Sequence, residues 1–466
     1  MGHRKVTMKK QIVNKKYIAL SLSPLLLTLS GACQAGTVAL GKSPSKESPP
    51  SGNPLSFLDG KVVFDVQEKM RGEYRANNFD FNSGLDSPTD DSWLLQRFRF
   101  GVKLKPTPFL TIYAQGQDVR EIGSDRPNVI GQLGAEGDDS LDLLQAYVEI
   151  GDPKKLSLKV GRQKFTYGDE RIIGPLEWAN QSRAFDAVKL HIEQATWNLD
   201  LFTSSVVKFS DGEFNRSDFL DSDSTRDQIF SGAYFSTTVL PFQITEAYLL
   251  HLNESGGTNF FTLGSRWKGL APKLNNWDYT LETAVQFGEV KDKDLQAFGG
   301  HLDVGHNFVS IPWKPRVGVE YNYGTGDSNP NDGDVGTFQN LFPTNHKFYG
   351  YMDVFSLQNM HNVAINLSAS PTEKLKLAVD AHAFWIADTI DSWYRANGTT
   401  AVRPAKAGAS NYAGAEIDFT ATYKATKWLG FQAGYSHFFA GDYLSDTGSG
   451  ASSDADFVYL QASIEF

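Results

Sequence analysis

The feature that most constrains this chain is an alternation of apolar and charged residues with a period of two. In residues 93–105, one face of an extended strand would be apolar and the other basic. The apolar face holds Leu94, Phe98, Phe100, Val102 and Leu104, and the opposite face holds Arg97, Arg99, Gly101, Lys103 and Lys105. Because successive side chains of a strand point to opposite sides, the pattern predicts a strand between an apolar medium and water.

Segments of the same kind recur as far as the C-terminus. They number about eighteen, and most reach the ~9–11 residues that a tilted strand needs to cross a bilayer. The predicted strands are 61–79, 92–105, 109–121, 139–150, 156–167, 183–194, 197–208, 226–239, 243–252, 258–268, 277–289, 295–308, 313–324, 353–369, 374–387, 411–424, 428–439 and 456–466. Acidic residues join the predicted polar face on the later strands, namely Glu282, Glu320, Asp380, Glu416 and Asp418.

The connections between these strands are alternately short and long. The short ones lie near Pro106, Pro153, Pro241, Pro371 and Lys427, and the long ones cover 80–91, 122–138, 168–182, 209–225, 325–352, 388–410 and 440–455. Short periplasmic turns and long extracellular loops are typical of outer-membrane barrels. We therefore predict an all-β fold over residues 58–466, a transmembrane antiparallel β-barrel of about 18 strands. A soluble sandwich or propeller is the alternative, but it accounts less well for this regularity.

Composition excludes several other classes of protein. The mean hydropathy is −0.34, and beyond the N-terminus no stretch approaches the ~18 apolar residues of a membrane helix. The net charge of −10, without a basic patch, argues against nucleic-acid binding. The single cysteine, Cys33, leaves no disulfide framework. Histidines are scattered and there is no GxSxG motif, so the chain is not expected to be an enzyme.

The N-terminus has the order of a secretory signal peptide. Basic residues precede the apolar stretch Tyr17–Leu29, and small residues follow it. We assign residues 1–35 to a signal peptide for Sec-type export, cleaved after Ala35 or Ala32, and note that a lipidated Cys33 is the alternative. Residues 36–57, rich in Ser, Pro, Lys and Gly, are predicted to form a disordered periplasmic leader. The expected destination is the outer membrane of a Gram-negative bacterium.

Two segments carry motifs that resemble those of a known family. Residues 159–190 include GRQKFTYGDERIIGPLEW, and residues 323–385 include GTFQNLFPTNHKFYGYMD. Both resemble the alginate-export family of outer-membrane porins. The resemblance implies a monomeric eighteen-stranded barrel that secretes an anionic polysaccharide. It also implies a lumen narrowed by arginine and lysine, with long loops, or a periplasmic one, folded into the pore as gates.

Cations on the predicted inner face are the candidate functional residues. The candidates for lining the pore or binding its solute are Arg97, Arg99, Lys103, Arg162, Lys189, Arg316 and Lys376. Fixed cations lower the barrier that an anion such as a uronate chain meets in a pore. The alternative is that they only hydrate the wall and pair with acids opposite, which would leave a field across the lumen. The phase of Arg162 is open, because a glycine bulge at Gly161 would turn it to the other face.

Two loops carry further candidate sites. In the first, ion pairs are expected to hold the loop in place, and their members are Asp169, Glu170, Arg171, Arg183 and Asp186. In the second, residues 324–334, the spaced oxygens of Asp327, Asp332 and Asp334 are compatible with calcium. We favour ordinary turns there, because Asn, Asp, Gly and Pro are common in turns. No other cofactor is expected.

Together these features predict a passive channel for the export or diffusion of anionic poly- or oligosaccharide, or of other polar solutes. The expected partners are outer-membrane lipid and lipopolysaccharide, the solute itself and periplasmic secretion components, with no nucleic acid. The alternative is a structural or ligand-binding outer-membrane barrel whose lumen is plugged.

Overall fold

In the computed structural model of this protein, the described residues are 54–77, 81–83, 90–125, 138–209, 214–219, 228–399, 401–448 and 452–466. The predicted signal peptide and residues 36–53 of the predicted leader lie outside them. The end of the predicted leader forms part of the sheet, whereas the sequence predicted disorder there. Ser56 and Phe57 form the short strand β1, which pairs with Val63 and Val62, and the ring of Phe57 packs against Phe64 at 5.8 Å. The sheet therefore begins within the segment predicted to be disordered.

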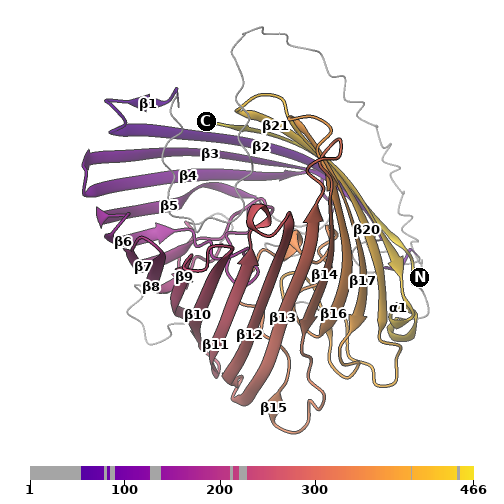
Figure 1. The fold of residues 1–466 in the computed structure, drawn as a ribbon. Coiled ribbons are helices and arrows are strands. Elements are labelled where there is room, and N and C mark those ends of the chain that lie inside the picture. The colour runs from indigo at the N-terminus through magenta and orange to yellow at the C-terminus, as the bar shows by residue number, and fades with distance from the viewer. Residues whose placement is uncertain are drawn as a thin grey trace, which may run out of the picture. The chain divides into compact units, whose positions relative to one another are not determined.

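Eighteen long strands form one closed antiparallel barrel (Figure 1). Each strand pairs with its two neighbours, and β22 pairs with β2 to close the ring. The strands are β2 (Val62–Ala76), β3 (Asp91–Thr107), β4 (Leu110–Ile122), β5 (Asp139–Asp152), β6 (Leu156–Gln163), β7 (Phe185–Glu193), β8 (Trp197–Val206), β9 (Gln228–Thr237), β10 (Gln243–Glu254), β11 (Thr258–Gly269), β12 (Trp277–Val290), β13 (Lys293–Asn307), β14 (Arg316–Gly324), β16 (Met360–Ala369), β17 (Leu375–Ile386), β20 (Tyr412–Lys424), β21 (Leu429–Ala440) and β22 (Ala455–Glu465).

The remaining elements of the described chain are short and lie in the connections. They are β15 (Asp334–Val335), β18 (Trp393–Tyr394), β19 (Ala401–Arg403), the helix α1 (Asp442–Thr447) and the 3-10 turns η1 (Ala271–Lys273) and η2 (Asn345–Lys347). In the described part of the chain, no helix is long and apolar enough to span a membrane. Each of the eighteen predicted strands corresponds to one long strand of the barrel.

The period-two pattern sets which side chains face the lumen. On β3, Phe98 and Phe100 are 38% and 43% exposed on the outer surface, whereas the inward Arg97 is 2% exposed. The acids predicted for the polar face also point inward, as the burial of Glu282 and Glu416 shows. The outer surface is consequently an apolar belt, and such a surface requires an apolar surrounding.

The two ends of the barrel differ in their connections. At the end where β2 begins and β22 ends, here called the turn end, the links are short, as between β5 and β6 or between β20 and β21. At the opposite loop end the links are long, except that β10–β11 and β12–β13 are joined by tight turns. The predicted strand 353–369 begins only at Met360, because the residues before it fold into the barrel.

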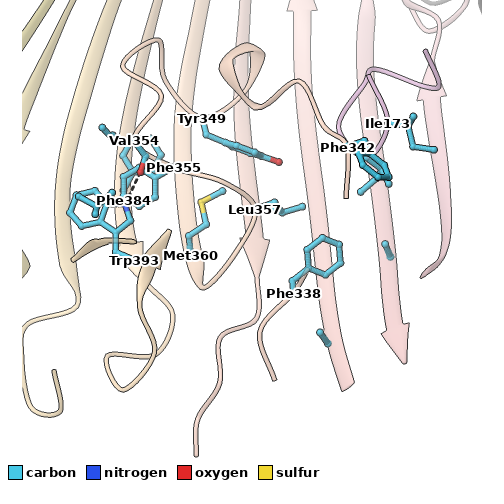
Figure 2. Close-up of a cluster of buried hydrophobic side chains, with 14 of the residues drawn as sticks. Ile173, Phe338, Phe342, Tyr349, Val354, Phe355, Leu357, Met360, Phe384 and Trp393 are labelled. Carbon is cyan, nitrogen blue, oxygen red and sulfur yellow. Dashed lines mark hydrogen bonds between the residues drawn. The ribbon is translucent and has the colours of Figure 1, made fainter. Parts of the chain in front are cut away.

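An apolar cluster lies inside the barrel toward the loop end (Figure 2). The ring of Phe355 stacks on Phe384 at 4.1 Å and on Trp393 at 4.7 Å, and the indole nitrogen of Trp393 donates to the carbonyl oxygen of Val354 at 2.8 Å. Residues 336–359, here called the inward loop, pack their apolar side chains against the strand faces, which supply most of the cluster. The interior of the barrel is thus a packed core at one end, and this packing positions the functional site.

The apolar belt gives a direct prediction of stability. Replacing Leu263, which is 51% exposed in the middle of β11, with arginine should cost about 2–4 kcal/mol of unfolding free energy, because a charge would face lipid. Val309→Arg, in a turn between β13 and β14, should cost about 0–1 kcal/mol. Reversible unfolding in phospholipid vesicles measures both, and equal costs would contradict this assignment of the outer face.

Candidate functional site

The segment between β6 and β7, residues 164–184, crosses the lumen and is here called the crossing segment. Residues near Glu177 contact β2 and β3, whereas Asp169 contacts β11 on the other side. Going round the ring of eighteen strands, β11 lies eight strands from β3, so these walls are nearly opposite. The crossing segment therefore spans the lumen from one wall to the nearly opposite one.

One end of the crossing segment is held through its backbone by cations of β2 and β3. The ammonium of Lys69 donates to the carbonyl oxygens of Glu177 and Trp178, at 3.1 and 3.2 Å. Arg71 donates to the carbonyl of Trp178 at 2.6 Å, and Arg97 donates to the carbonyl of Glu177 at 3.2 Å. Hydrogen bonds from charged donors are stronger than neutral ones, so this contact fixes the segment against the basic wall.

The carboxylate of Glu177 lies among three cations at this wall. One of its oxygens is 2.7 Å from Nη1 of Arg99 and 3.3 Å from Nη2 of Arg97, and the other is 2.6 Å from Nζ of Lys164. Burial raises the pKa of Glu177, but the attraction of the three cations outweighs that effect and holds its pKa well below the ordinary value. Glu177 is therefore ionised at neutral pH.

The other end of the crossing segment is anchored by ion pairs to the opposite wall. The carboxylate of Asp169 lies 2.6 Å from Nη2 of Arg266 and 2.9 Å from Nζ of Lys268. Burial raises the pKa of Asp169, and the two cations more than reverse this, which leaves its pKa below the usual range. Arg171 continues the anchor, with its guanidinium 3.4 Å from the carboxylate of Glu320 on β14.

The inward loop braces the crossing segment from a second side. The ring of Trp178 lies between Arg71, whose guanidinium carbon is 3.8 Å from the ring centre, and His346 of the inward loop, stacked at 3.8 Å. Nδ1 of His346 is 2.9 Å from the carboxylate of Asp353 in the same loop. Wall, crossing segment and inward loop therefore meet at Trp178.

The structure brings together two of the predicted pore cations and disperses the others. Arg97 and Arg99 both contact the crossing segment, as described above. Four more face the lumen elsewhere, namely Lys103, Lys189, Arg316 and Lys376. Lys189 lies 3.1 Å from Asp200, and Arg316 lies 2.5 Å from both Asp278 and Asp303. Pairing with acids one or two strands away therefore compensates part of the lumen charge.

Arg162 does not line the lumen. It shares the outward face of β6 with Val160, while Lys159 and Gln163 point inward, so Gly161 does not turn it to the inner face. Its guanidinium instead donates two hydrogen bonds to the carboxylate of Asp186, which lies directly opposite on β7. The Nε–Oδ1 and Nη2–Oδ2 distances are 2.9 and 3.0 Å. Arg162 therefore forms an ion pair on the outward face near the loop end and does not line the pore as predicted.

The residues predicted to form loop ion pairs contact partners outside their own group: Asp186 pairs with Arg162, and Arg183 contacts backbone carbonyl oxygens. Glu170 lies 3.3 Å from Lys347 of the inward loop. Arg183 donates to the carbonyl oxygen of Phe342 at 2.5 Å, and burial lowers its pKa to about 10. The loop is thus held by contacts that reach across the lumen, which spacing along the chain does not reveal.

The candidate calcium loop forms turns. The carboxylate of Asp327 accepts the backbone N–H of Asn329 at 3.0 Å, and that of Asp332 accepts the N–H of Asp334 at 3.0 Å. Among the residues that the structure describes, no three His, Cys, Asp or Glu side chains gather as metal ligands. Asp327 and Asp332 therefore accept hydrogen bonds within the turns that were favoured for this loop.

Several residues of the candidate site were missing from the sequence-based prediction. On β2, Lys69, Arg71 and Arg75 point inward and extend the basic wall, and the alternation in EKMRGEYR would have indicated them. Glu177 has no such signal, because it lies in an irregular segment whose path depends on tertiary contacts. Around the described lumen, cations are concentrated at β2 and β3, whereas β12, β14 and β20 carry inward acids, with Arg316 on β14 paired among them.

Comparisons with known proteins agree with this architecture. A family model described as alginate export matches residues 61–458. A search of curated proteins finds no match.

Solved structures share the fold at low sequence identity. OpdQ of Pseudomonas aeruginosa aligns with a TM-score of 0.57 and 12% identity, covering 87% of this chain and 97% of its own. The outer membrane protein opdK of the same organism gives 0.55 and 12%, covering 86% and 98%. OccAB4 of Acinetobacter baumannii gives 0.55 and 13%, covering 86% and 98%. At such identities the likeness establishes the barrel fold.

The anchor at Asp169 can be tested by substitution. Asp169→Asn should weaken the charge-assisted contacts to Arg266 and Lys268 and cost about 1.5–3 kcal/mol of local stability. Glu170→Gln, which affects a contact to the half-exposed Lys347, should cost about 0–1 kcal/mol. Hydrogen exchange of residues 164–184 measures the difference, and equal protection in the two variants would refute the anchor.

The pH dependence of the opposite end follows from Glu177. Because its pKa is lowered in the folded protein, its stabilising contribution is complete above the unfolded-state value of about 4.3 and is lost only as the pH falls toward the lower folded-state value. The difference in protection of residues 176–179 between the wild type and Glu177→Gln should therefore be the same at about pH 7 and at about pH 5, because Glu177 stays ionised throughout. A difference that shrinks across that interval, after correction for intrinsic exchange rates, would contradict this.

Proposed function

This chain belongs to the alginate export family, and from that premise we propose that it is a passive outer-membrane channel for anionic poly- or oligosaccharides or other polar solutes. The observation that carries the proposal is the pair Arg97 and Arg99, which face the lumen where the crossing segment narrows it. Fixed cations at a constriction attract anions into a region that is costly for charge to enter.

A second feature of the same wall suits a sugar chain. On the turn-end side of the constriction, the rings of Tyr113 and Tyr147 lie 5.4 Å apart on β4 and β5. The ammonium of Lys103 is 5.3 Å from the ring centre of Tyr113, and that of Lys159 is 4.4 Å from that of Tyr147. Tyr113 is buried and donates its hydroxyl to Asp65 at 2.9 Å, whereas the ring of Tyr147 is only partly buried. Aromatic faces can stack on sugar rings while ammonium groups attract carboxylates, so Tyr147 and the two lysines support a saccharide as the solute.

The family and the fold favour a non-enzymatic channel in the outer membrane. We propose further that residues 1–35 direct Sec-type export, that the barrel is a monomer among lipid and lipopolysaccharide, and that periplasmic secretion components deliver the solute when the channel works in export. The apolar belt supports the contact with lipid.

The competing candidate is a barrel with a plugged lumen that binds a ligand or serves as a structural element. The packing of the crossing segment and the inward loop inside the barrel favours it. The two candidates predict opposite results in a planar bilayer, since a plugged barrel passes no ions.

The channel is tested by reconstituting the whole protein in planar bilayers under a salt gradient. We expect discrete conductance steps and a reversal potential that favours anions. Arg97→Gln with Arg99→Gln should move that potential toward cations, because two cations leave the constriction. Lys376→Gln, at an exposed lumen position away from the constriction, is the matched control and should change it less. A wild-type barrel without conductance would refute the channel.

A further inference from the structure

The site around Glu177 consists of a fixed cationic part and a more accessible carboxylate. Arg97 and Arg99 are each 2% exposed, whereas the side chain of Glu177 is 38% exposed. Arg99 is also held from behind, because it donates to the side-chain oxygen of Gln117 at 2.7 Å and to the hydroxyl of Ser182. Arg99 is therefore positioned by contacts that do not depend on the carboxylate. Arg97 is likewise held by the carbonyl oxygens of Glu177 and Ala179, whereas Lys164 contacts the carboxylate itself.

The backbone of the crossing segment has attachments of its own at this point. The carbonyl oxygens of Glu177 and Trp178 accept hydrogen bonds from Lys69, Arg71 and Arg97. The stack of Trp178 on His346 adds a contact on the other side. The Glu177 side chain can thus leave the cations by rotation about its own bonds while the segment stays in place.

We propose that Glu177 is a tethered internal ligand that occupies the anion site of Arg97, Arg99 and Lys164 until the carboxylate of a solute replaces it. The proposal rests on the proposed channel function and names its solute class as carboxylate-bearing saccharides. A solute carboxylate has the same charge and the same two oxygens as Glu177, so the exchange replaces one set of charge-assisted hydrogen bonds with another.

The exchange has a clear consequence for transport. A cluster of cations that bound a polyanion without competition would retain it, whereas conduction requires binding weak enough for the solute to leave. When a solute carboxylate leaves the cations, the carboxylate of Glu177 takes its place. Tethering to the crossing segment gives the Glu177 carboxylate a high effective concentration there. Glu177 would therefore set the affinity of the constriction and favour movement of the chain through it.

The test uses Glu177→Gln in the full-length barrel, with block of the ion current by trigalacturonate as the readout. Because the amide no longer competes as an anion, the half-blocking concentration should fall about tenfold or more. Glu177→Asp keeps the carboxylate and should stay near wild type. Glu170→Gln removes a carboxylate of the same segment that faces Lys347, so it should also leave the block unchanged.

Neutral maltotriose separates competition from a simple opening of the passage. If Glu177→Gln strengthens block by trigalacturonate and leaves block by maltotriose unchanged, Glu177 competes as an anion. An equal change for both sugars, or no change for trigalacturonate, overturns the tethered-ligand proposal. Those outcomes leave the channel itself intact, because the channel is refuted only by a wild-type barrel that conducts no ions.

Discussion

The structure depends on the need to pair every backbone N–H and C=O group within an apolar surrounding. A sheet meets that need without edges only when it closes on itself, and here the pairing of β22 with β2 closes it. Closure gives each strand an outer face and an inner face. The alternation of apolar and polar side chains then follows, and with it the apolar belt and the charged lumen.

Closure also creates a lumen. Charges of the crossing segment pair with charges of the wall inside it, whereas on a surface loop they would lie in water. The crossing segment is anchored at Asp169 by Arg266 and Lys268, and at its other end by the basic wall of β2 and β3. Both contacts are ionic or charge-assisted, which suits an interior that is neither dry nor fully solvated. The same contacts bring Glu177 to Arg97 and Arg99, so the element that narrows the passage also carries the carboxylate at its centre.

Much of the barrel was predictable because each strand carries its own pattern. The inward direction of Arg97, Arg99, Glu282 and Glu416 follows from period two alone. Arg162 shows the limit of this reasoning, because a glycine beside it left its phase open until the pairing with β7 settled it. The sequence pattern also predicted that residues 353–359 belong to a strand. Their apolar side chains instead pack in the lumen and not in the wall.

The sequence by itself determined the class of fold, the number of strands and the face on which most wall residues lie, because alternation is a local property of a strand. Tertiary structure alone decided where the irregular segments run and which charges they meet. Glu177 and Arg99 are 78 residues apart in sequence, and only closure of the barrel and folding of the crossing segment into it bring them together. The cation cluster around Glu177 is therefore a property of the assembled lumen, whereas the barrel is specified strand by strand.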